Sequence, residues 1–245
     1  MNEENYYASR REEMLQGFDR VAELTKPFVA ERYGADFAEQ LHRDARQEYK
    51  AIIPQIPYIR ERRGAALNSF LRVTAQEIAA YKAMKKNGKS AAEAWEICHE
   101  ALQQSVKLVP AIKRWCLRNM MYSAIMRRRL KKLTAQGKQL GFGDFEIKYV
   151  PGDGNFDYGI DYVKCGNYNL ALALDAKEFA PFVCMSDITL SGVLGWGLTR
   201  TETLADGCAR CDFRFKRGAP TRISSRTPEV QQTIERIAAR EAKGK

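Results

Sequence analysis

Apolar side chains in the first 140 residues recur every three or four positions, which is the spacing of one face of an α-helix. Met14, Phe18 and Val21 are the first to show it. With prolines at first turns and Gly or Asn after last turns, this pattern predicts helices over residues 8–24, over 27–41 with a break at Gly34, and over 68–86, 90–106 and 110–137. The segment IIPQIPYI, residues 52–59, is expected to be extended because a residue that precedes proline disfavours helix.

After residue 140 the pattern changes to the alternation of apolar and polar side chains that is typical of β-strands. Two alternating segments, 145–150 and 156–163, flank the turn sequence PGDGN and predict a hairpin. Further elements are expected as follows: strands within 188–204 and 211–216, a short helix over 167–177, and a last helix that starts at Thr227-Pro228. The predicted fold class is therefore α+β, with a helical N-terminal region (1–140) packed on a C-terminal antiparallel sheet with short helices (141–245), in one integrated domain.

Composition narrows the class of protein. The chain has 245 residues, of which 45% are apolar and 29% charged, as in an ordinary globular protein. Its longest apolar runs, such as Leu170–Leu174, fall far short of the roughly 20 residues of a membrane helix. The chain opens Met1-Asn2-Glu3-Glu4 rather than with a basic and then apolar leader, so we expect a cytoplasmic protein with reduced cysteines and no membrane partner.

The net charge of +10 comes from one segment. Ten Lys or Arg and no Asp or Glu lie between Ala101 and Gly143, and elsewhere basic and acidic residues balance. Arg127, Arg128 and Arg129 could contact the phosphates of a nucleic acid. The favoured interpretation is a solvated basic face, because apolar residues in the same helix indicate that another face is buried; these are Trp115, Leu117, Met121, Ile125 and Leu133. A nucleic-acid or acidic partner is the minority interpretation.

Histidine chemistry has little support in the sequence. The two histidines, His42 and His99, lie in predicted helices without a metal-binding or catalytic pattern around them. The sequence also has no phosphate-binding loop, no dinucleotide-binding glycine pattern and no serine nucleophile elbow. Any chemistry is therefore expected to use thiol, carboxylate, guanidinium or hydroxyl groups.

The C-terminal half carries four cysteines, and Cys208 and Cys211 form a CxxC pair. The other two, Cys165 and Cys184, stand alone, which is a weak zinc pattern, so buried inert thiols are favoured. The alternation of residues 211–216 puts Cys211 on one face of a strand with Phe213 and Phe215.

Charged residues in the same strands have two interpretations each. Asp212 and Arg214 share the face opposite Cys211, where they could simply form an ion pair. Arg200 follows an apolar, glycine-rich stretch, and its guanidinium could hold a carboxylate bidentately. A surface charge on an edge strand explains Arg200 equally well.

Four segments in this order resemble the L-2-amino-thiazoline-4-carboxylic acid hydrolase family: GDGNFDYGIDYVKC (152–165), APFVCMSD (180–187), LTRTETLADG (198–207) and CDFRFKRG (211–218). ERYG (31–34) and EYKAIIPQIPYI (48–59), followed by a helix with Asn68, resemble its N-terminal region, so the likeness covers most of 28–218. The sequence departs from the family at 60–63, where a short glycine-containing segment is expected. The order of the cysteines is similar, more distantly, to that of 4-vinyl-reductase-type ligand-binding domains.

The resemblance implies a hydrolase that opens a small cyclic amidine or lactam-like, anionic substrate at a carbon–nitrogen or carbon–sulfur bond, of which we favour the carbon–nitrogen bond. On the positions that match the family we expect Cys184 as nucleophile, with water as the alternative, Asp187 as general acid/base and Arg200 as clamp for the substrate carboxylate. Further residues expected to bind substrate are Tyr58, Cys165, Thr201, Thr203, Cys211, Asp212 and Arg214. No cofactor is expected, although a metal bound by Cys165, Cys184 and Cys211 stays open, as does self-association. The distant resemblance implies the alternative, a non-catalytic small-ligand or metal-binding sensor.

Overall fold

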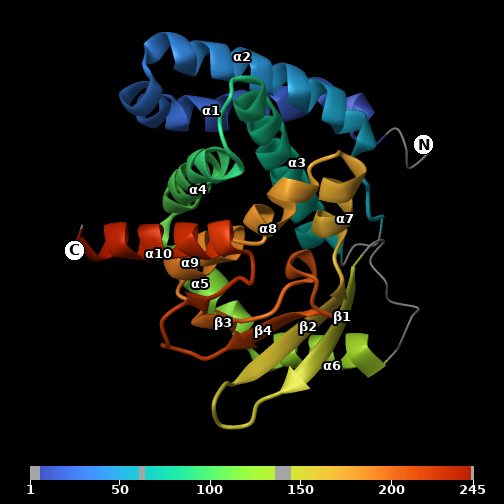
Figure 1. Ribbon diagram of the computed structural model, residues 1–245. Helices are drawn as coiled ribbons and strands as arrows, with labels where there is room; N and C mark the ends of the chain where they lie inside the picture. Colours follow the sequence, from blue (N-terminus) through green and yellow to red (C-terminus); the bar gives the residue numbers. More distant parts are fainter. Residues whose placement is uncertain (1–5, 61–63, 136–144, 244–245) are drawn as a thin grey trace. The chain divides into compact units, whose positions relative to one another are not determined.

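The computed structural model describes residues 6–60, 64–135 and 145–243, and confirms the α+β class (Figure 1). The chain forms two compact units. The first consists of Met1–Ser105 and Gly166–Val183, and the second of Val106–Cys165 and Cys184–Lys245. The division of the chain at residue 140 stays a prediction.

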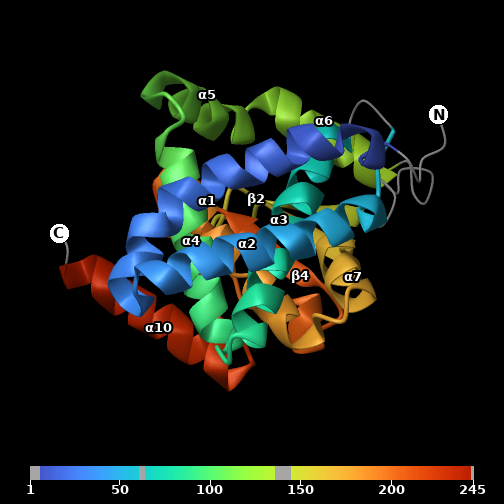
Figure 2. The ribbon, with the colours of Figure 1, turned by 90° about the horizontal axis from the view of Figure 1, so that it is seen from above.

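The first unit is helical. Its helices are α1 (Arg11–Tyr33), α2 (Ala35–Ile52), α3 (Ala65–Lys86), α4 (Ala91–Lys107), α7 (Gly166–Ala173) and α8 (Ala180–Val183), with 3₁₀ turns η2 (Ala8–Arg10), η3 (Ile53–Gln55) and η6 (Lys177–Phe179). Helices α1 and α2 lie side by side, and α2 also packs on α3 (Figures 1 and 2). Large buried side chains such as Tyr49, Tyr81 and Trp95 fill the space between the helices, so the apolar faces that the sequence predicts form this core.

Two proline predictions in this unit are wrong. Helix α1 continues through Pro27, which was expected to open a new helix, and ends only at Gly34 with φ of +92°. Thr25 and Val29 are buried on either side of the proline, so packing outweighs the lost backbone hydrogen bond. Residues 52–55 are helical rather than extended, because Pro54 has the backbone φ that the first turn of the 3₁₀ segment η3 requires.

The second unit is built on a five-stranded sheet in the order β1-β2-β4-β3-β5. The strands are β1 (Glu146–Pro151), β2 (Tyr158–Lys164), β3 (Leu198–Arg200), β4 (Cys211–Phe215) and β5 (Arg222–Ile223). The predicted hairpin is confirmed as β1–β2. All neighbours are antiparallel except β3 and β5, so the sheet is mixed rather than wholly antiparallel.

The helices of the second unit are α5 (Ala111–Met121), α6 (Ala124–Ala135), α9 (Ser186–Leu194) and α10 (Pro228–Lys243), with the 3₁₀ turn η7 (Leu204–Asp206). Helix α6 packs against β1 (Figure 1). Leu130 of α6 joins Tyr158, Ile160, Leu198 and Phe215 in the core on this face of the sheet. Helix α10 begins at the predicted Thr227-Pro228 boundary.

The basic segment differs from its prediction in two ways. The expected single helix is interrupted between α5 and α6, where the Ser123 hydroxyl accepts the amide hydrogen of Met126 at 3.1 Å and so starts a new helix. Its expected end near 137 lies outside the described residues. The apolar face of α5 is not buried, since Trp115 is 55% exposed, and Ile125 in α6 is 64% exposed. Among the described residues of this segment, Met121, Tyr122, Met126 and Leu130 pack against the core.

Residues 186–194 form helix α9, although this stretch was expected to be a strand. Ile188, Thr189 and Val193 are β-branched, which favours strands on local preference alone. The helix is closed by Gly195, which has φ of +67° and donates its amide hydrogen to the Ser191 carbonyl at 2.8 Å.

No helix among the described residues is both long and apolar enough to cross a membrane.

Candidate functional site

Strand register determines which side chains of the second unit share a face. Tyr162 of β2 lies opposite Cys211 of β4, and Ile160 lies opposite Phe213. Leu198 of β3 lies opposite Phe215, so Arg200, two residues further, points to this same face. We call this side of the sheet the arginine face. It therefore presents a guanidinium, a thiol and a phenol among aromatic side chains.

Arg200 is the most constrained polar residue on the arginine face, with only 2% of its surface exposed. Its Nη1 donates to the carbonyl oxygen of Cys184 at 2.6 Å and to a carboxylate oxygen of Asp187. The guanidinium carbon lies 5.7 Å from the ring centre of Phe213. Nε is buried and has no hydrogen-bond partner. An unpaired buried donor is costly, so this atom marks a place where an acceptor would be stabilised.

Asp187 is in the first turn of α9 and faces Arg200 with 26% of its side chain exposed. Burial raises the pKa of this carboxyl above its usual value, although the charge and hydrogen bond of Arg200 act in the opposite direction. A carboxyl group with a raised pKa can exchange a proton closer to neutral pH than an ordinary aspartate. This position thus suits the acid/base role expected from the sequence.

The thiols near Arg200 are held in the protonated form. Burial raises the pKa of Cys184 well above its usual value; Arg200 lowers it, and the nearby Cys211, Cys165 and Asp187 raise it further. Burial likewise raises the pKa of Cys211 to about 12, although its sulfur accepts the amide hydrogen of Leu204 at 3.3 Å. Since the thiolate is the nucleophilic form, Cys184 needs a base before it can attack.

Tyr162 is a member of this group that sequence reasoning missed. Burial raises the pKa of its phenol, and the closeness of Cys165, Asp187 and Cys211 raises it further. The alternation of residues 156–163 could have indicated it, because it places Tyr162 on the apolar side of its strand. We refer to Tyr162, Cys165, Cys184, Asp187, Arg200 and Cys211 as the Arg200 cluster. Four segments of the second unit thus bring together all the candidate catalytic residues.

Other expected substrate ligands lie on the opposite face of the sheet. Asp212 of β4 lies opposite Asp161 of β2 in the strand register. Its carboxylate accepts hydrogen bonds from the Thr201 amide and hydroxyl, both at 2.7 Å. Arg214 donates to Asp161 at 2.8 Å. Arg214 thus pairs with Asp161 rather than with Asp212, which was the ion pair that the sequence allowed, and Asp212 instead binds Thr201. The structure does not bring Thr201, Asp212 and Arg214 together with the Arg200 cluster.

Two remaining candidates also have local partners. Thr203 is buried, and its hydroxyl accepts the Asp206 amide hydrogen at 3.0 Å, which caps η7. Tyr58 belongs to the first unit, where its ring stacks on Tyr6 with centroids 3.5 Å apart. Of the neighbouring segment 60–63 that departs from the family pattern, residues 61–63 lie outside the described chain. The substrate-binding roles of these residues stay predictions.

The cysteines give no direct support to the metal alternative. Cys165, Cys184, Cys208 and Cys211 are not in disulfide bonds. Within the part of the chain that the structure describes, no group of three or more His, Cys, Asp or Glu side chains is placed to hold a metal ion. Metal binding by Cys165, Cys184 and Cys211 therefore remains a sequence hypothesis.

Comparison with known proteins identifies one family. The model of the L-2-amino-thiazoline-4-carboxylic acid hydrolase family matches residues 68–215. No curated protein and no solved structure matches the chain. The matched segment contains every residue of the Arg200 cluster and ends at the last residue of β4.

Proposed function

The chain belongs to the L-2-amino-thiazoline-4-carboxylic acid hydrolase family, and on this basis we propose that it opens a small cyclic, anionic substrate by hydrolysis of a carbon–nitrogen bond. The observation that carries the proposal is the buried Arg200 guanidinium, which binds Asp187 through Nη1 and keeps an unpartnered Nε. A cation and an adjacent carboxyl group are what an anionic amidine-type ring needs for binding and for proton transfer.

Arg200 is proposed to bind the substrate carboxylate. Its Nη1 is already used by the Cys184 carbonyl and Asp187, whereas the buried Nε has no hydrogen-bond partner and can donate to a ligand. A carboxylate accepts most strongly from the planar edge of a guanidinium, where two parallel hydrogen bonds can form. Binding there would satisfy the buried Nε and would fix the ring beside Asp187.

Asp187 is proposed to carry the proton transfers. As base, its carboxylate takes a proton from a water molecule whose oxygen attacks the ring carbon between nitrogen and the second heteroatom. A tetrahedral centre forms, and the protonated Asp187 then gives its proton to the ring nitrogen as the carbon–nitrogen bond breaks. The raised pKa of Asp187 favours the second step, and the Arg200 charge keeps the ionised form available for the first.

Cys184 is proposed as the second catalytic residue. Because its thiol is protonated, attack by sulfur requires that Asp187 first remove the proton. The thiolate would then add to the same ring carbon, and the ring carbon–nitrogen bond would break as Asp187 returns the proton to nitrogen. Water would next hydrolyse the carbon–sulfur bond of this adduct, which releases the product and restores the Cys184 thiol. Mass spectrometry of the intact protein during turnover distinguishes the two routes, because only the thiolate route adds the mass of the substrate to the protein.

The direct test is a screen of thiazolines, cyclic amidines and lactams that carry a carboxylate, with detection of products that have gained one water. Asp187→Asn and Arg200→Lys should abolish ring opening. The matched controls Asp212→Asn and Arg214→Lys change the same residue types on the opposite face and should retain it. Ring opening that survives Asp187→Asn and Arg200→Lys, or that is lost equally in the controls, contradicts the proposed site.

A further inference from the structure

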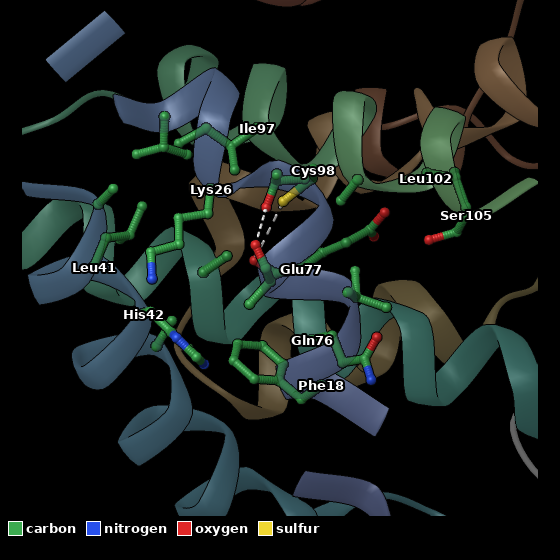
Figure 3. A pocket seen from close by; sticks show the side chains of 18 of the residues that line it. Phe18, Lys26, Leu41, His42, Gln76, Glu77, Ile97, Cys98, Leu102 and Ser105 are labelled. Carbon is green, nitrogen blue, oxygen red and sulfur yellow. Dashed lines mark hydrogen bonds between the residues drawn. The ribbon is translucent and has the colours of Figure 1, made fainter. Parts of the chain in front are cut away.

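Helices α1 to α4 of the first unit line a cavity of about 230 Å³ that is partly open to solvent (Figure 3). Most of its wall is apolar, with Phe18, Leu41, Ile97 and Leu102 among the larger side chains, although Lys26, His42, Gln76 and Glu77 also line it. Each of the four helices also contributes alanine, namely Ala22, Ala38, Ala45, Ala80 and Ala101. These small side chains leave the space open, where larger ones would fill it as in a normally packed interior.

Several polar groups around the cavity have partners within the protein. Lys26 pairs with Glu39, and His42 contacts a carboxylate oxygen of Asp19 at 3.0 Å. The Thr25 hydroxyl donates to a carbonyl of its own helix at 3.0 Å. Among the described residues, no buried side-chain atom that lacks a hydrogen-bond partner belongs to the cavity wall. The mainly apolar wall therefore favours an occupant without charge or strong hydrogen-bonding groups.

The cavity differs from the Arg200 cluster in position and in chemistry. Phe18 and Leu41 come from α1 and α2, which precede the segment 68–215 that matches the family model. The Arg200 cluster presents a buried cation, whereas this cavity presents aliphatic and aromatic carbon. An anionic ring substrate suits the first and not the second.

We propose that this cavity is a second binding site, which takes a small, neutral, apolar molecule. An apolar cavity of about 150 Å³ binds benzene, so one of this volume accommodates on the order of ten carbon atoms. Sites between the helices of bundles are common places for such ligands. Val21, Leu102 and Ser105 in the wall are partly exposed, which gives a route of entry.

The test uses the full chain and the neutral fluorescent probe N-phenyl-1-naphthylamine, whose emission rises in apolar surroundings. The wild-type protein should bind it saturably with one site per chain. Ala45→Leu fills the cavity from α2 and should weaken binding at least tenfold. Ala51→Leu places the same side chain on the exposed side of α2 and should change the affinity less than twofold. Asp187→Asn, in the Arg200 cluster, should leave probe binding unchanged.

Ala101→Leu fills the cavity from α4 and replaces Ala45→Leu if that variant does not fold, as judged by circular dichroism. A measurement without variants uses Cys98, a buried thiol in the wall, and the exposed Cys116 as reference. The probe should slow modification of Cys98 by a small neutral thiol reagent and leave Cys116 unaffected.

Three results would overturn this proposal: no saturable binding by the wild-type chain, equal affinity in the Ala45, Ala101 and Ala51 variants, or loss of binding in Asp187→Asn. A fourth is a change of oligomeric state in Ala45→Leu, since the cavity would then be an interface between copies. None of these results decides whether the Arg200 cluster is catalytic, because ring opening is measured separately.

Discussion

The ion pair between Arg200 and Asp187 leads to a quantitative prediction about stability. Arg200→Met keeps most of the side-chain length but removes the charge, and it leaves the Asp187 carboxyl without its partner. Removing one member of a fully buried ion pair costs roughly 3–5 kcal/mol. Because 26% of the Asp187 side chain is exposed, water can compensate in part. We therefore expect a loss of about 2–4 kcal/mol in the free energy of unfolding.

The pair can be separated from simple packing by a double-mutant cycle. Asp187→Asn alone leaves Arg200 buried without a counter-charge, and the double variant removes both charges. The double variant should be more stable than the sum of the two losses predicts, by about 1–3 kcal/mol. Urea is the suitable denaturant because guanidinium salts screen ion pairs. In a Trp95→Phe background, the remaining tryptophans, Trp115 and Trp196, both report on the second unit.

The ion pair also predicts how the stability difference between wild type and Arg200→Met changes with pH. Burial raises the folded-state pKa of Asp187, so its own contribution to stability is complete below the unfolded pKa and falls as the pH rises towards the folded pKa. Arg200 opposes this rise by stabilising the ionised form. The difference between wild type and Arg200→Met should therefore be largest near neutral pH and shrink as Asp187 becomes protonated. Additive losses in the cycle, or a difference that grows in acid, would refute the ion pair as described.

The remaining predictions concern catalysis, thiol reactivity and partners. Asp187→Asn should lower kcat for ring opening at least about 100-fold, as expected for loss of a general acid/base, while Asp212→Asn stays near wild type in the same steady-state assay. Iodoacetamide near pH 8 should modify the exposed Cys116 and spare Cys211, whose pKa of about 12 keeps it protonated; peptide mapping that finds Cys211 modified first would contradict this. Alanine in place of the arginines at 127–129 should leave turnover unchanged if their charge is only a solvated face. Metal analysis of the purified protein that finds stoichiometric zinc or iron, together with no turnover, would favour the sensor alternative.

Much of the fold was predictable because its signals are local. The helix over 68–86, the 145–163 hairpin and the start of the last helix at Thr227-Pro228 follow from periodicity, turn residues and capping, and the structure confirms them. The errors arise where packing outweighs local preference. Helix α1 passes through Pro27, and the β-branched Ile188, Thr189 and Val193 lie in a helix closed by Gly195.

The residues of the candidate site were also largely visible in the sequence, since the family resemblance and residue chemistry point to Cys184, Asp187 and Arg200. Alternation along residues 211–216 already separated Asp212 and Arg214 from Cys211, but the sequence could not say which groups of other strands lie beside Cys211. That depends on strand register, because shifting by one residue along a strand moves a side chain to the other face of the sheet. Register places Tyr162 beside Cys211.

Sequence alone therefore determined the α+β class, most elements and the types of reactive group, all of which depend on neighbours within a few positions. Tertiary structure decided which of those groups meet, that Arg200 is buried with an unpartnered Nε, and that alanines from four helices face a common cavity. These features depend on contacts between residues far apart in the chain, and local sequence patterns carry no information about how far apart two packed surfaces will lie.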